Sequence, residues 1–580
     1  MTTRLLILGL DGATLDLVEP WAHAGYLPNL AALMHRGSVG RLRSTLPAMT
    51  LPAWSTFLTG CNPGCHGLFD FTRRVPGRYA VEFVNATHRR APTFLRIMSD
   101  AGKRVAGLGI PTTYPPEPLN GAVIAGFDSP VSVSRDASFV YPRALHAELR
   151  RAVGDFPLTD LQETRIRDFR WHRDALGRLA RAVEGQARIA RYLLKREAWD
   201  CFSIVFGASD TVAHHFWAFH DSASPRFDAA GAAEFGGAIR SIYEHLDRAV
   251  GKLIDAAGPG ADVFVISDHG FGGTGDKAIS INRRLHETGL LSLKRRRGIV
   301  PLASGWAKRV GLRLLPADMQ QRMFRRLGGA VGALESTSRF AHVDWPHTVA
   351  YSEDLNTFPS VWINLRGREP GGVVNPEDYE WTRDRVIDAL HEWTDPETGQ
   401  PIVARAYRRE EVYAGPMLRD APDVVVELAL DAGYSYAVEA ARTPGPAMRR
   451  MDRSEHVGAK GRSMNGSHRS EGVLIAAGPS ILRGAQIGGP SLADLAPTLL
   501  ALAGLPEGAY HMDGRVLDEL LARERLSLHT GDSWPASRLT PAPLDYAQGF
   551  GPGQAQPTLT YSTAEAAIVS RRLRALGYLE

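Results

Sequence analysis

Short apolar runs alternate with longer amphipathic stretches along most of this chain. Four runs are hydrophobic at nearly every position and are bounded by Gly, Asp or Ser, which is typical of parallel strands buried on both faces of a sheet. They span residues 4–9, 200–206, 262–267 and 472–477. Helical periodicity predicts helices over residues 27–36, 170–196 and 237–257. The alternation predicts an α/β fold with a mostly parallel central sheet flanked by helices.

Two regions interrupt the alternation and indicate how the chain is organised. Residues of about 285–345 begin with a run of Lys and Arg, and we expect a cap-like insertion there and another over about 70–180. A solvated insertion is the simpler interpretation of the basic region, and contact with a membrane surface or an anionic substrate is the alternative. Residues 526–561 are rich in Pro, Gly, Ser and Gln and predict a linker or extended arm. We therefore expect one large domain over residues 1–525 and a C-terminal helix over 562–580, which docks back or supports a homo-oligomer.

The composition limits the kinds of binding partner and the cellular compartment that we expect for this chain. The chain has 67 basic and 63 acidic residues and a pI of about 8.9, so net charge does not favour a nucleic-acid polymer as partner. Its three cysteines are too few for a disulfide framework, and Cys61 and Cys65 lack the second cysteine pair that would complete a zinc site. The apolar run at the N-terminus stops at Asp11 without a cleavage site, and no stretch is long enough to span a bilayer. We expect reduced thiols, a cytoplasmic location and no transmembrane segment.

Acidic residues and a histidine follow two of the predicted strands directly. Asp11 ends the first run and precedes Gly12, whereas Asp268 and His269 end the third run and enter a glycine-rich turn. The carboxyl ends of parallel strands are where open α/β sheets place their sites. Asp11 alone could equally cap the next helix. Adjacent Asp268 and His269 form the strongest single motif, because the end of a buried strand rarely carries an acid and an imidazole for packing reasons.

Two further positions supply candidate metal ligands. Asp210 and His214 follow the second run, and their spacing of four places both on one face of a helix, aimed at one metal ion. His215 and His220 are the alternatives, and the spacing favours His214. His468 follows a glycine- and polar-rich loop and precedes another apolar strand, which suits a ligand that arrives from a loop.

A cluster of hydroxyl groups supplies a candidate nucleophile. Thr50 precedes a predicted helix, so its oxygen lies near free backbone N–H groups, which favour a bound anion and assist an activated alkoxide. Thr45, Ser55, Thr56 and Thr59 compete for this role, and each also fits a helix cap or a buried hydroxyl.

These residues stand in phrases that together resemble the alkaline phosphatase superfamily. The phrases are GLDGAT, TLPAWSTFLTGCNPGCHG, SDTVAH, ISDHGF and NGSH, and they run in the family's order from residue 9 to residue 468. They are most similar to the nucleotide pyrophosphatase/phosphodiesterase-like branch, and within it to bacterial proteins described as predicted phosphohydrolases or phosphomutases. The resemblance implies an alkaline-phosphatase-like core, a phosphothreonine intermediate and two divalent metal ions, with zinc expected and manganese also compatible.

The resemblance also implies how the candidate residues divide between the two ions. One ion would be surrounded by Asp11, Thr50, Asp268 and His269. The other would be held by Asp210, His214 and His468.

One position departs from the family pattern. The phosphodiesterase branch carries an asparagine beside the phosphoryl oxygen, and Phe71 stands at that position here.

We expect a hydrolase of a small phosphate ester or nucleotide, with a diester or nucleotide pyrophosphate ahead of a monoester. A phosphomutase and a non-catalytic anion-binding protein are the alternatives. Arg89, Asn364 and Arg368 are candidate phosphate contacts, for which a structural role is the simpler interpretation.

Overall fold

A computed structural model describes most of the chain. The described residues are 3–129, 137–154, 168–294, 340–353, 358–441, 445–456, 464–506, 510–522, 561, 565–566 and 568–570. Most of the basic region within 285–345, nearly all of the predicted linker and most of the C-terminal helix lie outside these residues. Within the described part, no helix has the length and apolar character needed to cross a membrane.

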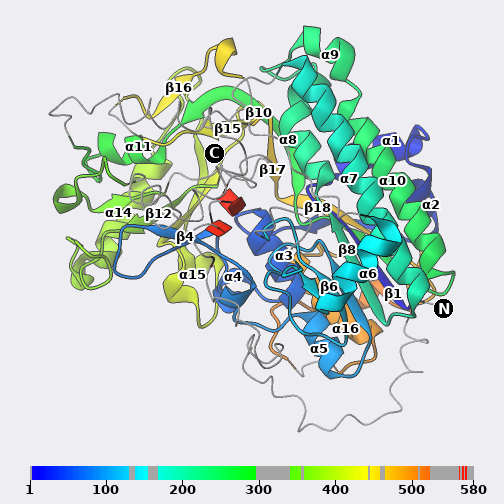
Figure 1. The fold of residues 1–580 in the computed structure, drawn as a ribbon. Helices are drawn as coiled ribbons and strands as arrows, with labels where there is room; N and C mark the ends of the chain where they lie inside the picture. Colours follow the sequence, from blue (N-terminus) through cyan, green and yellow to red (C-terminus); the bar gives the residue numbers. More distant parts are fainter. Residues whose placement is uncertain are drawn as a thin grey trace, which may run out of the picture.

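The central element is an eight-stranded sheet in the order β2-β18-β9-β1-β8-β5-β6-β7 (Figure 1). The five strands from β9 to β6 are parallel to one another, which confirms the mostly parallel sheet. The strands are β1 (Leu5–Leu10), β2 (Ser38–Arg43), β5 (Val105–Leu108), β6 (Gly121–Ile124), β7 (Val140–Tyr141), β8 (Cys201–Phe206), β9 (Asp262–Ile266) and β18 (Glu471–Ala477).

The predicted direction of the last of these strands was wrong. Strand β18 pairs antiparallel with both β9 and β2, although the run at residues 472–477 predicted a parallel strand. Its residues from Gly472 to Ala477 are all buried, so the apolar run correctly predicted that both faces of the strand are buried. Burial carries no information about strand direction, because an interior strand is covered by helices in either orientation.

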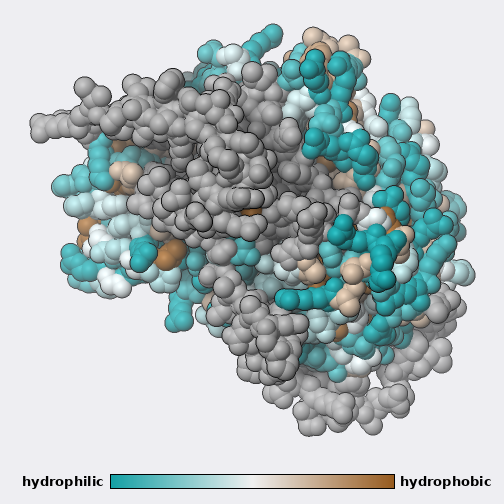
Figure 2. All heavy atoms as spheres, viewed as in Figure 1, coloured by the Kyte–Doolittle hydropathy of each residue, from teal (hydrophilic) through white to brown (hydrophobic). Residues whose placement is uncertain are grey.

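Helices cover both faces of this sheet, as the alternating side chains of β1 show. Leu6 and Leu8 pack in one hydrophobic core with helices of the first face, whereas Leu5 and Ile7 pack in a second core with helices of the other face. The first face carries α1 (Leu15–His23), α2 (Pro28–Arg36), α7 (Phe169–Arg196), α8 (Ala208–His220) and α10 (Ala238–Ala257). The second face carries α3 (Thr50–Thr59), α5 (Phe94–Asp100) and α16 (Leu495–Leu502). Figure 2 shows that the outward surface of the helices on the first face is mainly hydrophilic.

A smaller antiparallel sheet lies beside the main one, on the left in Figure 1. Its order is β11-β12-β14-β13, and it shares a hydrophobic core with α11 (Ile281–Glu287) and α14 (Tyr379–His391). The strands are β11 (Ala350–Tyr351), β12 (Ser360–Ile363), β13 (Val403–Arg408) and β14 (Val424–Leu428). The sequence patterns did not predict this sheet, because its strands are only two to six residues long.

A long strand, β10 (Gly270–Ile279), leads from the end of β9 toward the smaller sheet. It pairs with β15 (Ser435–Val438), β16 (Met448–Arg450) and β17 (Gly466–Arg469). This pairing brings residues near 468 to the carboxyl end of β9.

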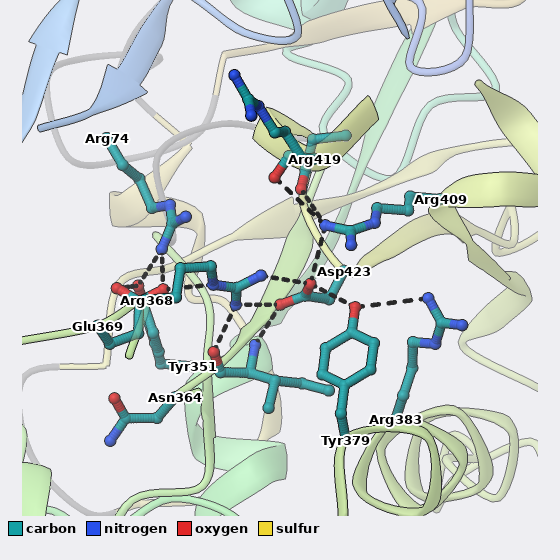
Figure 3. Close-up of polar contacts among 12 residues, drawn as sticks. Arg74, Tyr351, Asn364, Arg368, Glu369, Tyr379, Arg383, Arg409, Arg419 and Asp423 are labelled. Carbon is teal, nitrogen blue, oxygen red and sulfur yellow. Dashed lines mark hydrogen bonds and ion pairs between the residues drawn. The ribbon is translucent and has the colours of Figure 1, made fainter. Parts of the chain in front are cut away.

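A buried carboxylate organises the smaller sheet (Figure 3). Asp423 receives two hydrogen bonds from the Arg368 guanidinium, at 2.6 and 2.7 Å, and one from the Tyr379 hydroxyl at 2.7 Å. The Asn364 amide donates to the Thr348 carbonyl at 2.8 Å. These contacts support the structural interpretation of Arg368 and Asn364 over the phosphate-binding one.

Candidate two-metal active site

Three strands of the main sheet deliver acidic side chains to one edge. Asp11 follows β1, Asp268 follows β9, and Asp210 lies in the first turn of α8, directly after β8. All three are fully buried. The three carboxylates therefore lie at the carboxyl edge of the sheet, where open α/β sheets place their sites.

The other predicted residues lie at the same edge of the sheet but on different structural elements. Thr50 is the first residue of α3, whose N-cap residue Met49 makes no side-chain capping bond. His214 lies one turn after Asp210 on α8. His468 lies on β17, opposite Phe271 of β10. The structure thus brings together the seven residues that the sequence assigned to the two metal ions.

A first group consists of Asp210, His214 and His468. The Nε2 atoms of the two histidines are 3.0 Å apart, and Oδ1 of Asp210 lies 3.4 Å from His214 Nε2 and 3.3 Å from His468 Nε2. The Nδ1 atoms of the two rings lie 2.8 Å from the Gly466 carbonyl and 2.9 Å from the Ala48 carbonyl. Because a carbonyl can only accept, each Nδ1 carries a proton, and the Nε2 atoms of the two rings face each other. This arrangement favours a cation bound between the two Nε2 atoms.

A second group is centred on His269. Its Nδ1 donates to the Gly270 carbonyl at 3.0 Å, which directs the lone pair of Nε2 into the site. That Nε2 lies 3.4 Å from Oγ1 of Thr50, 3.3 Å from Oδ2 of Asp268 and 3.6 Å from Oδ1 of Asp11. The two groups adjoin, since Asp210 Oδ1 is 4.0 Å from His269 Nε2 and the rings of His269 and His468 stack with centroids 3.6 Å apart.

Electrostatics of the site favour positive charge. Burial, together with the charges of Asp268 and Asp210, raises the pKa of Asp11 well above its usual value, and burial also raises the pKa of Asp268. Burial opposes ionisation of Asp210, but the neighbouring His214 and His468 outweigh it and lower its pKa. Burial lowers the pKa of His269 and of His468. Three crowded carboxylates beside three imidazole rings are an environment that divalent cations stabilise.

The donor set fits two metal ions. Among the described residues, Oδ1 of Asp11, both carboxylate oxygens of Asp210 and Oδ2 of Asp268 are buried and accept no hydrogen bond. A tetrahedral ion with bonds of about 2.0–2.1 Å separates its ligand atoms by about 3.3 Å. The separations within each group, 3.0–3.4 Å in the first and 3.3–3.6 Å from His269 in the second, are close to that value. Nitrogen and oxygen donors without thiolate suit zinc or manganese.

Some contributors to the site were not predicted from the sequence. The Trp54 indole donates to Oδ2 of Asp11 at 3.0 Å, and the carbonyl groups of Ala48 and Gly466 orient two histidines. Trp54 lies one helical turn after Thr50, and that spacing was the only sequence signal that could have suggested its role. The role of a backbone carbonyl cannot be predicted from the sequence, because every residue has a backbone carbonyl.

Other candidates lie elsewhere. The Arg89 guanidinium donates to the Thr112 carbonyl at 2.8 Å and lies 3.4 Å from Glu117, which supports a structural role. His215 is stacked edge-on against Trp171, whereas His214 faces the site. Phe71 is 2% exposed and packs in a hydrophobic cluster. Its neighbours there include Met49, Leu51, Leu68, Val84 and Val569.

Comparisons with known proteins bear on the family and the fold. A family model described as type I phosphodiesterase / nucleotide pyrophosphatase matches residues 5–462. Among curated protein sequences, none matches the chain significantly. Phosphonoacetate hydrolase from Sinorhizobium meliloti 1021, solved with phosphonoformate, is similar with a TM-score of 0.50 and 16% identity, covering 86% of this chain and 96% of that chain. Human ectonucleotide pyrophosphatase / phosphodiesterase 5 aligns at a TM-score of 0.48 and 13% identity, over 90% of this chain and 100% of its own. The first of these two likenesses shows a shared fold.

Proposed function

Because the chain belongs to the type I phosphodiesterase / nucleotide pyrophosphatase family, we propose that it is a two-metal hydrolase of small phosphate esters. Membership of this family confirms the resemblance to its branch of the alkaline phosphatase superfamily that the motifs predicted. Phosphodiesters or nucleotide pyrophosphates are the proposed substrates, ahead of monoesters.

The observation that carries the proposal is the pair of histidine Nε2 atoms, 3.0 Å apart, with Asp210 in contact with both. A hydrogen bond between them would need a proton on one Nε2 in addition to the protons that both Nδ1 atoms donate. Burial disfavours that extra charge on His468. A divalent ion removes the conflict, because each Nε2 lone pair then binds the ion.

Thr50 is the proposed nucleophile. Its oxygen attacks phosphorus, so that the Thr50–phosphorus bond forms as the bond to the leaving alcohol or phosphate breaks, and the hydroxyl proton passes through solvent to the leaving oxygen. A water molecule then attacks phosphorus and breaks the Thr50–phosphorus bond; its hydroxyl group stays on phosphorus and its other proton restores the Thr50 hydroxyl. Two divalent ions, when bound, would lower the pKa of that hydroxyl and neutralise charge on the transferring phosphoryl group. The N-terminus of α3 presents its first N–H groups to the same anion.

The charge of the site supports a diester. Three carboxylates against two divalent ions leave one net positive charge, which matches the single negative charge of a phosphodiester or of each phosphate linkage in a nucleotide. A monoester dianion would leave the buried site negative, and Phe71 supplies no polar atom to offset it. A phosphomutase, in which the phosphoryl group returns to a second substrate hydroxyl, is the remaining alternative. The cytoplasmic location and the homo-oligomer stay predictions.

The test is turnover of bis-p-nitrophenyl phosphate against p-nitrophenyl phosphate with added Zn²⁺ or Mn²⁺, together with metal content by mass spectrometry. We expect at least two of these ions per chain and faster turnover of the diester. Thr50→Ala removes the nucleophile and should abolish turnover while it leaves the metal content nearly unchanged.

The matched control is Thr59→Ala, at the far end of the same helix, where the hydroxyl donates to the Ser55 carbonyl at 2.7 Å. This variant should keep its turnover. Full activity of Thr50→Ala would refute the mechanism, and faster turnover of the monoester would refute the substrate class.

A further inference from the structure

A second cluster of metal-binding side chains lies at the opposite end of α3. Cys61 and Cys65 converge with Asp513, and one ligand atom from each lies within 4.8 Å of the others. Helix α3 runs from Thr50 to Thr59, and its length places Thr50 about 14 Å from this end at the helical rise of 1.5 Å per residue. The cluster is therefore separate from the proposed catalytic centre and shares no residue with it.

We propose that Cys61, Cys65 and Asp513 form a structural zinc site, with His511 as the fourth ligand. Two thiolates, a carboxylate and an imidazole are a donor set that zinc accepts, and four protein ligands make a closed, structural site. Binding would release two protons, one from each thiol, as the two zinc–sulfur bonds form.

The geometry allows these four ligands to meet. Tetrahedral zinc with bonds of about 2.3 Å to sulfur separates two sulfur ligands by about 3.8 Å, so the observed spread of up to 4.8 Å closes with small rotations of the side chains. Nε2 of His511 already lies 3.7 Å from Oδ1 of Asp513, and the His511 side chain is 78% exposed and able to turn. Oδ2 of Asp513 accepts hydrogen bonds from the Asn62 backbone and side-chain amides at 2.6 and 2.8 Å. That pairing fixes the carboxylate between the two cysteines.

The backbone around the cluster is already arranged to hold it. Gly60 ends α3 in the left-handed conformation at φ 68°, which turns the chain directly into Cys61. The Gly60 carbonyl accepts hydrogen bonds from the amides of Asp513 and Gly514 at 2.8 and 3.1 Å. The two chain segments are thus joined in the absence of metal, and zinc would lock the end of the nucleophile-bearing helix to the segment that follows α16.

A disulfide between Cys61 and Cys65 is the competing chemistry, because both are free and close in space. It would use the two sulfur atoms and would not involve Asp513 or His511. The convergence of Asp513 on the two cysteines favours metal binding.

The experiment replaces bound metal by Co²⁺ in the full chain under reducing conditions. A thiolate bound to Co²⁺ gives a sulfur-to-cobalt charge-transfer band in the near ultraviolet, and the catalytic centre, which has no sulfur ligand, cannot give one. We expect this band in the wild-type chain and its loss in Cys61→Ser and Cys65→Ser. Each of these variants should also bind one zinc ion fewer than the wild-type chain. His511→Ala should keep the band and lower the affinity for zinc at least tenfold.

Cys201→Ala is the matched control, because Cys201 lies buried at the start of β8; it should leave the band unchanged. A wild-type chain without the band would overturn the proposal. So would a titration of the unreduced, denatured chain that finds one reactive thiol instead of the three in the sequence, since this would establish the disulfide. Neither result depends on turnover, so failure of this proposal is distinguishable from failure of the proposed function.

Discussion

His66 provides a stability test that is independent of catalysis. Its ring is fully buried just after α3, where Nδ1 accepts a hydrogen bond from the Leu68 amide at 3.2 Å and Nε2 lies 3.0 Å from the Thr56 hydroxyl. The amide can only donate, so Nδ1 has no room for a proton. Burial, helped by the charge of Arg89, lowers the pKa of His66 from 6.5 to about 3.

This pKa difference makes the free energy of unfolding depend on pH. Between pH 6.5 and 3, His66 is protonated in the unfolded chain but not in the folded chain. The contribution of His66 to the free energy of unfolding is therefore fully present above pH 6.5 and is lost as the pH falls toward 3. At about 1.4 kcal/mol per pH unit, lowering the pH from 7 to 4 should remove about 3 kcal/mol through this residue.

The Gln side chain of His66→Gln cannot titrate. We therefore expect the difference in the free energy of unfolding between this variant and the wild-type chain to become smaller in acid. At pH 7 the variant should be less stable by about 1–3 kcal/mol, because the Leu68 amide loses its acceptor. The gap should shrink by about 3 kcal/mol at pH 4. The free energy of unfolding in guanidinium chloride, followed by tryptophan fluorescence at both pH values, measures this change.

His347→Gln is the control, since the His347 side chain is 74% exposed. Its gap with the wild-type chain should stay below about 1 kcal/mol at both pH values, because an exposed pair such as His347–Asp344 contributes little to stability. A gap for His66→Gln that is the same at pH 7 and pH 4 would refute the reasoning.

Two further substitutions test contacts described above. Trp54→Phe keeps a ring but removes the donor to Asp11, so metal affinity should fall about 10- to 100-fold in competition with a chelator; unchanged affinity would contradict the orienting role. Asp423→Asn removes the buried carboxylate that pairs with Arg368 and should cost about 3–5 kcal/mol in urea unfolding. The exposed Asp384→Asn should cost less than about 1 kcal/mol, and equal costs for the two would count against the buried pair.

The sequence predicted those parts of the fold in which local pattern determines structure. The predicted strand at 262–267 differs from β9 (Asp262–Ile266) by one residue, and the predicted helix at 170–196 differs from α7 (Phe169–Arg196) by one residue. Long apolar or amphipathic stretches have a clear period, so their positions were predictable. The direction of β18 was not, because it depends on a return of the chain across the sheet.

The candidate site was predictable in its residue types and not in its long-range contacts. Asp268 and His269 stand together at a strand end, and Asp210 and His214 share a helical face, so each pair was visible locally. Asp513 lies far along the sequence from Cys61, and no local pattern joins them. That separation explains why the two cysteines alone suggested no zinc site.

The late position of His468 has a consequence for biosynthesis. The other six residues of the candidate site lie within the first 269 residues, whereas His468 arrives on β17 about 200 residues later. At about 5–20 residues per second, a ribosome needs about 10–40 s to add that stretch. Throughout this time the nascent chain lacks one of the three ligands proposed for the first metal ion. The proposed hydrolase would therefore become competent to cleave phosphate esters only after His468 has been synthesised and β17 has paired with β10.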